Sequence, residues 1–343
     1  MIILGTNSIK DTGYDVANSC RFNRADSPNL TKTPSSSGNL RKWTWSCWVK
    51  RSSISNGSQT MFNAGSSANN QIRFDSDDTI NFYQYNSGYT ARLATNQKFR
   101  DVSAWYHIVA HWDTDNSTAG DRMKLFVNGT EVTSFATDTN PSQNLDSYFG
   151  ASGTALYVGD KGDGAEEMDG YLAEVVFIDG QNLAPTSFGE FDEDSPRIWK
   201  PKDVSELSSS KGTNGFYLDF EDSSNLGNCA WGSTDLTEVN LAATDQSTDT
   251  PTNNFATWNP LAYTGKTAMA EGNLQGYGDN NDSHNDGGIA TIGVSTGKWY
   301  WEMKITAVGG SVAVGIFPNT ATVEEGVDMF AATNSIYYKS NGK

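Results

Sequence analysis

Apolar and polar residues alternate along much of this chain, and the alternation predicts strands. In Trp43–Lys50 every second residue is Trp, Cys or Val, while the residues between them are mostly polar. A period of two is typical of a strand with one buried face. Similar segments follow at Gln59–Asn63, Gln71–Asp75, Thr79–Tyr85 and Tyr89–Ala94, separated by clusters of Asn, Gly, Ser and Asp. Short strands at this spacing indicate a sandwich or jelly roll.

A hairpin is predicted further along the chain. The apolar strand Trp105–Trp112 runs into a polar loop, and Met123–Val127 then leads through Asn128-Gly129 into Thr130–Val132. Asn-Gly between two apolar runs predicts a type I′ turn, because both residues accept a positive φ. Tyr171–Ile178 is apolar on both faces, which indicates a strand inside the sandwich.

The second half of the chain changes in composition. A short helical turn is expected at Leu183–Phe188, followed by an acidic stretch whose ordered part is expected at Gly215–Phe220. Residues 187–250 hold thirteen acidic residues against four basic ones, which marks a domain boundary. Alternation returns at Lys298–Ile305 and Ser311–Ile316, so a second β domain is expected.

Charge and cysteine content exclude several classes of protein. The net charge is −17; residues 1–110 carry +5, and the rest carries −22, which would repel nucleic acid. No apolar run in the sequence is long enough to span a membrane, and we expect no ordinary secretion signal. Cys20, Cys47 and Cys229 are scattered, and buried free thiols are expected rather than disulfides or a zinc site.

Two blocks resemble a known family. Trp105–Val109, followed about 15 residues later by Lys124–Gly129, resembles the centre of laminin-G and pentraxin-like domains, and Asp169–Val175 resembles their closing strand. The resemblance covers roughly residues 15–190. It implies an all-β, concanavalin-like jelly-roll sandwich of two antiparallel sheets.

A second resemblance lies near the end of the sequence. Gly297–Glu302 resembles the Gly-Lys-x-Tyr-Trp-Glu signature of SPRY domains, and Val312–Ile316 resembles their next strand. Lys343 falls about halfway along such a domain, so we expect the rest to lie elsewhere or another chain to complete the sheet. The expected domains are a jelly roll with an N-terminal arm (1–198), a loop-rich connector (199–252) and an incomplete SPRY-like sandwich (253–343).

Several short segments together resemble large structural proteins of tailed bacteriophages, especially marine ones. The segments are Gly5–Ser8, Arg21–Asn23, Phe188–Asp192, Trp199–Lys202 and Gly215–Phe220. The resemblance implies a virion component such as a tail, fibre or decoration protein, assembled in the host cytoplasm and released by lysis. Its expected partners are other virion proteins, further copies of itself and a host-surface glycan.

Aromatic residues beside amides are the candidate glycan-binding residues. Sugar rings have apolar C–H faces that stack on aromatic rings, and their hydroxyls bond to Asn and Asp. The preferred residues are Tyr83, Tyr85, Tyr89, Asn81 and Asn86. The alternative is that these side chains pack on neighbouring strands.

Two acidic loops are candidate calcium sites, because carboxylate oxygens are the ligands that Ca²⁺ prefers. Asp160, Asp163 and Glu166 lie in one loop, which the laminin-G resemblance favours. Asp113 and Asp115 lie in the other, with Asp121 nearby. The alternative for both loops is ordinary turn carboxylates, and neither fits an EF-hand.

No convincing catalytic motif is found. Glu190–Asp194 has the spacing of carboxylates in some glycoside hydrolases but reads as a solvated connector. His107 and His111 share a strand face without a third zinc ligand, and a metal site in the polar loop Asp279–Gly288 is disfavoured. We therefore predict a non-enzymatic adhesion or assembly protein. The alternatives are a polysaccharide depolymerase and a purely architectural spacer.

Overall fold

The computed structural model describes residues 13–66, 69–264, 267–278, 287–308, 312–320, 323 and 333–340. The chain divides into two compact units, one of Thr6–Phe255 and one that includes Ala256–Lys343. In the described residues all helical segments are short 3-10 turns: η2 (Arg24–Asp26), η3 (Ala119–Asp121), η4 (Pro185–Ser187), η5 (Ser205–Ser210) and η6 (Ala243–Asp245). None of these segments has the length and apolar character needed to cross a membrane. Strands make up the rest of the regular structure, so the expected all-β class is confirmed.

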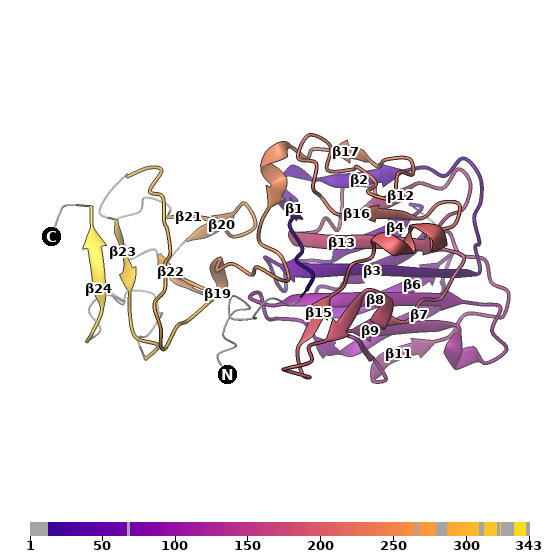
Figure 1. Cartoon of the computed structure of the whole chain (residues 1–343), viewed down its shortest axis with the longest axis horizontal. Helices are drawn as coiled ribbons and strands as arrows, with labels where there is room; N and C mark the ends of the chain where they lie inside the picture. The colour runs from indigo at the N-terminus through magenta and orange to yellow at the C-terminus, as the bar shows by residue number, and fades with distance from the viewer. Residues whose placement is uncertain are drawn as a thin grey trace. The chain divides into compact units, whose positions relative to one another are not determined.

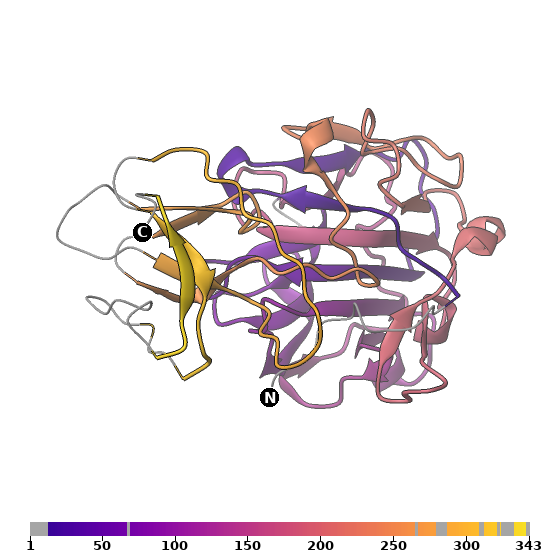
Figure 2. The same ribbon diagram turned by 60° about the vertical axis from the view of Figure 1, so that its left-hand side comes forward.

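The larger unit contains two eight-stranded antiparallel sheets, which Figures 1 and 2 show as stacked layers. Sheet A has the order β10 (Thr130–Glu131), β9 (Met123–Val127), β8 (Trp105–Asp113), β3 (Lys42–Arg51), β13 (Gly170–Asp179), β1 (Ser19–Phe22) and β18 (Gln246–Ser247), and β16 (Phe216–Leu218) also pairs with β13. Sheet B has the order β11 (Phe135–Thr139), β7 (Tyr89–Lys98), β6 (Thr79–Tyr85), β5 (Asn69–Phe74), β4 (Gln59–Ala64), β12 (Leu156–Val158), β2 (Asn29–Lys32) and β17 (Thr237–Val239).

Aromatic rings fill the space between the two sheets. Trp43 of β3 is buried and lies with its ring centroid 4.9 Å from that of Phe149 and 6.1 Å from that of Trp112. Phe62 of β4 stacks on Phe149 at 4.3 Å. The Trp43 indole Nε1 donates to the Ser147 hydroxyl at 2.9 Å, so its polar atom is satisfied inside the core. The apolar positions that alternate in the sequence are therefore those that face inward.

The predicted hairpin between β9 and β10 is present. Asn128 and Gly129 have φ values of 48° and 76°, as a type I′ turn requires. A Cβ on Gly129 would come within 2.4 Å of the Trp199 ring, so glycine is also needed there for close packing. Trp199 belongs to β15 (Trp199–Pro201), which pairs with β14 (Gly189–Phe191).

The expected connector at 199–252 is corrected by the structure. Strands β16, β17 and β18 of this segment join sheets A and B, and β15 forms its own hairpin. Phe216 and Leu218 are buried in the core, and the buried Asp249 pairs with Lys50 at 2.7 Å. The acidic composition reflects the exposed turns of this segment. Its short apolar strands nevertheless complete the sandwich.

The second unit contains two-stranded sheets in its described residues. They pair β19 (Trp258–Thr264) with β22 (Gly287–Ala290), β20 (Ala268–Ala270) with β21 (Gln275–Tyr277), and β23 (Ala313–Ile316) with β24 (Ile336–Lys339). The strand expected at Lys298–Ile305 is not formed, and these residues are exposed. Alternation favours a strand, but a strand also needs a neighbouring backbone to accept and donate its hydrogen bonds.

Candidate functional site

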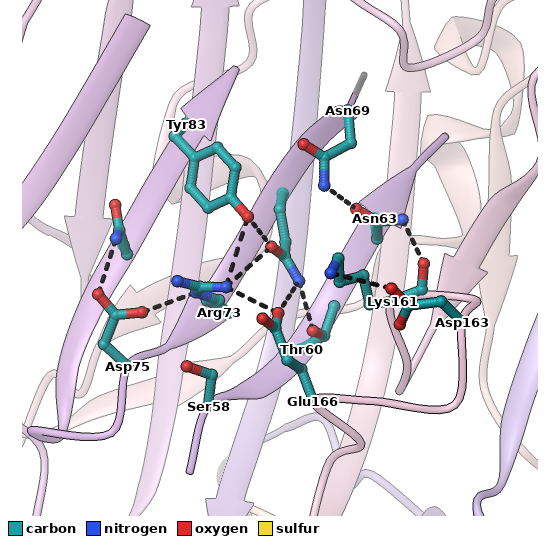
Figure 3. A network of polar contacts seen from close by, with 12 residues as sticks. Ser58, Thr60, Asn63, Asn69, Arg73, Asp75, Tyr83, Lys161, Asp163 and Glu166 are labelled. Carbon is teal, nitrogen blue, oxygen red and sulfur yellow. Dashed lines mark hydrogen bonds and ion pairs between the residues drawn. The ribbon is translucent and has the colours of Figure 1, made fainter. Parts of the chain in front are cut away.

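Polar side chains cover the face of sheet B that points away from the core. On β5 and β6 the central inward positions are apolar, and the outward positions carry amides, an arginine and tyrosines. Figure 3 shows these side chains lying across neighbouring strands and meeting a loop that follows β12. We call this surface the polar face and define it by Thr60, Asn63, Gln71, Arg73, Asp75, Asn81, Tyr83 and Glu166.

Arg73 is the centre of the polar face. Its Nε donates to Asp75 Oδ1 at 2.7 Å, and its Nη1 donates to Glu166 Oε2 at 2.7 Å. The guanidinium lies 5.2 Å from the centre of the Tyr83 ring. Burial acts to lower the pKa of Arg73, but the charges of Tyr83, Asp75 and Glu166 outweigh it and hold that pKa above its ordinary value.

Gln71 ties this centre to the neighbouring strand and to the loop. Its Nε2 donates to Thr60 Oγ1 at 2.6 Å and to Glu166 Oε2 at 2.8 Å. The Tyr83 hydroxyl donates to Gln71 Oε1, and burial raises the pKa of this tyrosine to about 12. The network holds the polar groups of the face in fixed positions, which lowers the entropy cost of binding a ligand there.

Two of the five predicted glycan-binding residues are buried. Tyr83 is 5% exposed and Asn81 is fully buried. Both are on the outward face, but the side chains of Arg73 and Arg92 pack over them, and Arg92 Nε donates to Asn81 Oδ1 at 3.2 Å. In this structure long cross-strand neighbours cover these two side chains, so neither offers a surface for direct sugar contact.

The other three predicted residues lie together at one end of the polar face. Tyr85 is 37% exposed, Tyr89 is 46% exposed, and Asn86 in the turn between them is also exposed. The two tyrosines face each other across the end of the β6–β7 hairpin, with ring centroids 5.4 Å apart. A register shift in this hairpin brings Tyr89 within 5.2 Å of the Tyr83 ring as well.

Arg92 adds a cation to this exposed aromatic pair. Its guanidinium carbon lies 4.5 Å from the centre of the Tyr89 ring. The arginine therefore holds one face of that ring and presents N–H donors beside it. Apolar ring surface next to amide and guanidinium donors is the combination that a hydroxylated ring needs for binding.

The first candidate calcium loop does not bring its carboxylates together. Asp160 is buried and accepts from the backbone N–H of Lys161 at 2.5 Å, while burial raises its pKa. Asp163 pairs with the Lys161 ammonium at 2.9 Å, and Glu166 pairs with Arg73. Each carboxylate thus has a protein partner, and these residues do not fit a calcium site.

The carboxylates of the second candidate calcium loop are also paired with basic side chains. Asp113 pairs with Lys42 at 3.2 Å, Asp115 with Arg41 at 3.8 Å, and Asp121 with Lys124 at 3.0 Å. No group of three His, Cys, Asp or Glu side chains that could hold a metal ion occurs in the part of the chain described above. The alternative interpretation, ordinary turn carboxylates, describes both loops.

The remaining sequence candidates have structural partners. Glu190 and Asp192 both pair with Lys200, at 3.5 and 3.4 Å, so they do not face each other across an open groove. His111 Nε2 lies 2.6 Å from the Leu183 carbonyl oxygen. The cysteines are buried and free, as predicted. Of the loop Asp279–Gly288, residues 279–286 lie outside the described residues.

The His107 ring on β8 stacks on Trp48 of β3 and on Trp199 of the β14–β15 hairpin. The Trp199 indole, which can only donate, gives its N–H to His107 Nδ1 at 3.0 Å, and His107 Nε2 lies 2.8 Å from the Ser46 hydroxyl. The imidazole is therefore neutral, with its proton on Nε2. Burial lowers its pKa to about 3.

Sequence reasoning missed a buried carboxyl in β13. Glu174 has a φ of 51° at a register shift, where β1 pairs with the first part of β13 and β16 with the last part. Its carboxyl accepts from the Tyr217 hydroxyl at 2.9 Å and from the Tyr14 hydroxyl at 3.1 Å. Burial raises the pKa of Glu174 to about 8, against the opposing effect of the two hydroxyls. The available signal was a glutamate within an apolar strand.

Comparisons with known proteins bear on the fold of the larger unit. The family model described as the concanavalin A-like lectin/glucanases superfamily, laminin G type, matches residues 26–182. No curated protein matches the chain. A SAP-like pentraxin from Limulus polyphemus is 16% identical, with a TM-score of 0.36, and the match covers 50% of this chain and 81% of that one.

Two further solved structures show comparable similarity. Domain 4 of an extracellular arabinanase from Geobacillus stearothermophilus is 17% identical, with coverages of 46% and 69% and a TM-score of 0.33. Domains LG4-5 of the mouse laminin α1 chain are 12% identical, with coverages of 47% and 40% and a TM-score of 0.32. The two antiparallel sheets form a jelly-roll sandwich, and residues 26–182 within it are similar to the concanavalin A-like lectin/glucanases family model.

Proposed function

We propose that the larger unit binds a carbohydrate through Tyr85, Tyr89 and Arg92 and does not cleave it. The observation that carries this proposal is the exposed tyrosine pair, with an arginine stacked on one ring. An isolated exposed aromatic residue is ordinary, but a pair fixed by a hairpin and a cation offers a preformed surface. The concanavalin A-like fold of residues 26–182 is compatible with carbohydrate binding.

The buried network beneath these residues supports the same proposal. Arg73, Gln71 and Glu166 hold Tyr83 in place, and Tyr83 in turn contacts Tyr89. A sugar on the exposed pair would therefore meet rings whose positions are already set. Asn86 in the turn adds an exposed amide that can donate to and accept from sugar hydroxyls.

The binding test is an array of bacterial-surface oligosaccharides, followed by titration of the best-bound one. Tyr89→Ala should weaken binding about tenfold, which is about 1.4 kcal/mol. Phe191→Ala is the matched control, because Phe191 is also 46% exposed but lies on the β14–β15 hairpin. Equal binding by the wild type and Tyr89→Ala would refute the proposed surface.

Catalysis is tested on the same oligosaccharide. The acidic motif considered for hydrolysis is paired with Lys200, and we propose no reaction. Incubation of the protein with the bound glycan should release no new reducing ends over hours. Release of reducing ends that scales with protein concentration would favour the depolymerase alternative instead.

We further propose that the chain is a component of a tailed-bacteriophage particle, with a SPRY-like module after the jelly roll. Support comes from the resemblance of segments such as Phe188–Asp192 and Trp199–Lys202 to phage structural proteins. Weak binding by each copy is sufficient in a particle, because many copies act together. Particles that lack Thr6–Phe255 should assemble and adsorb less well to host cells. Unchanged adsorption with particles that fall apart would make the unit architectural.

A further inference from the structure

A pocket of about 440 Å³ lies beside the buried Glu174 cluster, on sheet A and away from the polar face of sheet B. Its walls come from the segment before β1, from η5 and the residue Asp203 before it, from β16 and from the loop that follows β16. The residues that the argument uses are Tyr14, Asp203, Tyr217, Asp219, Glu221 and Trp231. The volume falls within the range of pockets that hold small ligands, roughly 300–1,000 Å³.

Three aromatic rings form the apolar part of the pocket. Tyr217 and Trp231 lie with ring centroids 5.4 Å apart, and the Tyr14 hydroxyl is 3.3 Å from that of Tyr217. Both tyrosines are anchored by hydrogen bonds to Glu174. Their rings are thus held in place from below by a group that is itself buried, so the wall is built before a ligand arrives.

The charge of the pocket is negative and unbalanced. Asp203, Asp219 and Glu221 line it, and no lysine or arginine within the described ranges forms an ion pair with any of them. Burial raises the pKa of Asp219, and the charge of Glu221 raises it further. By contrast, the carboxylates of the polar face are paired with arginine. No lysine or arginine lines the pocket, although the Lys211 ammonium donates to the Trp231 carbonyl oxygen at 2.8 Å.

Trp231 lines the pocket with its ring, while its indole Nε1 is itself buried and out of reach of a ligand. Polar contacts to a ligand come from other side chains. The hydroxyls of Ser205 and Ser208 line the same pocket and can donate or accept.

We propose that this pocket binds an amino sugar, whose protonated amine meets the carboxylates and whose ring lies against the aromatic walls. A metal ion fits less well, because it would need several oxygen ligands converging on one point, and aromatic rings do not supply them. An organic cation gains from both the acidic groups and the ring faces. The ring hydroxyls of a sugar can form hydrogen bonds with the hydroxyls of Ser205 and Ser208.

The test is calorimetric titration of the full chain with glucosamine, N-acetylglucosamine and glucose in low salt at about pH 6. The three sugars share a ring, and glucosamine alone carries a positive charge. Glucosamine should bind at least tenfold more tightly than the other two. Equal affinity for all three, or no binding of glucosamine, would overturn the proposal.

Variants separate this pocket from general charge effects. Asp219→Asn combined with Glu221→Gln should weaken glucosamine binding at least tenfold. Asp222→Asn is the matched control, because Asp222 is a neighbouring acid that caps the turn at Ser224 and does not line the pocket. Full binding by the double variant, with an unaltered circular dichroism spectrum, would contradict the assignment.

Discussion

Glu174 makes stability depend on pH in a direction opposite to that of most carboxylates. Its pKa is raised by burial from 4.5 to about 8 in the folded chain. Between these values the folded state holds a proton that the unfolded state releases, so the free energy of unfolding falls as pH rises. Replacing Glu174 with Gln removes this loss, because the amide is neutral at all pH values and can still bond to the hydroxyls of Tyr14 and Tyr217.

The size of the effect follows from the two pKa values. Linkage over this interval gives about 4 kcal/mol of destabilisation between about pH 5 and about pH 9. Glu174→Gln should therefore be close to wild type in stability at the lower pH. It should be more stable than wild type by roughly this amount at the higher pH.

Urea unfolding at several pH values measures the difference directly. Subtracting the two curves removes the contribution of groups such as His107 that titrate in both proteins. Glu193→Gln is the control, because Glu193 is an exposed glutamate, and it should give a curve parallel to wild type. Parallel curves for Glu174→Gln and wild type would refute the reasoning, since Glu174 would then titrate alike in the folded and unfolded states.

Three further predictions concern the sandwich. Asp78→Asn should lower the free energy of unfolding in urea by about 3–5 kcal/mol, because it leaves the fully buried Arg51 without its charge partner. Replacement of the neighbouring exposed residue, Asp77→Asn, should lower it by under about 0.5 kcal/mol, and equal losses would contradict the prediction. Gly129→Ala should lower the free energy of unfolding by about 2–4 kcal/mol, because the new Cβ would lie 2.4 Å from the Trp199 ring. Gly153 has a similar φ but open space around it, so Gly153→Ala should lower it by about 1–2 kcal/mol. A similar loss in both variants would contradict the role of packing against Trp199. Because the pKa of His107 is depressed, the free energy of unfolding falls as pH drops from 6.5 toward 3, by about 3 kcal/mol at about pH 4. His107→Gln should lack this loss of stability in acid, although it is less stable than wild type near neutral pH. If the variant loses as much stability in acid as wild type does, His107 is not the group responsible.

The strands of the sandwich were predictable where apolar residues alternate with polar ones. Trp43–Lys50 and Thr79–Tyr85 alternate clearly, and Asn128-Gly129 is a local turn signature. The structure contains the two strands and the turn at these positions. The short strands β16 to β18 were not predicted as parts of the sheets. Their place depends on partners about 40 or more residues away in the sequence, which no local pattern encodes.

The candidate site was predictable only in part, for a related reason. Tyr85 and Tyr89 end or begin their strands at a hairpin, where exposure follows from position. Tyr83 and Asn81 share their face but are covered by Arg73 and Arg92 from neighbouring strands. The Glu174 cluster joins residues 14, 174 and 217, and only the folded sheet brings them together.

Carbohydrate binding at the exposed tyrosine pair is tested most directly by NMR of the tyrosine rings. The oligosaccharide that binds best on the array would be titrated into protein with labelled tyrosines. The resonances of Tyr85 and Tyr89 should shift in proportion to occupancy, while those of Tyr157 and Tyr217 stay in place. Shifts confined to other tyrosines, or none at saturating oligosaccharide, would contradict carbohydrate binding at this surface.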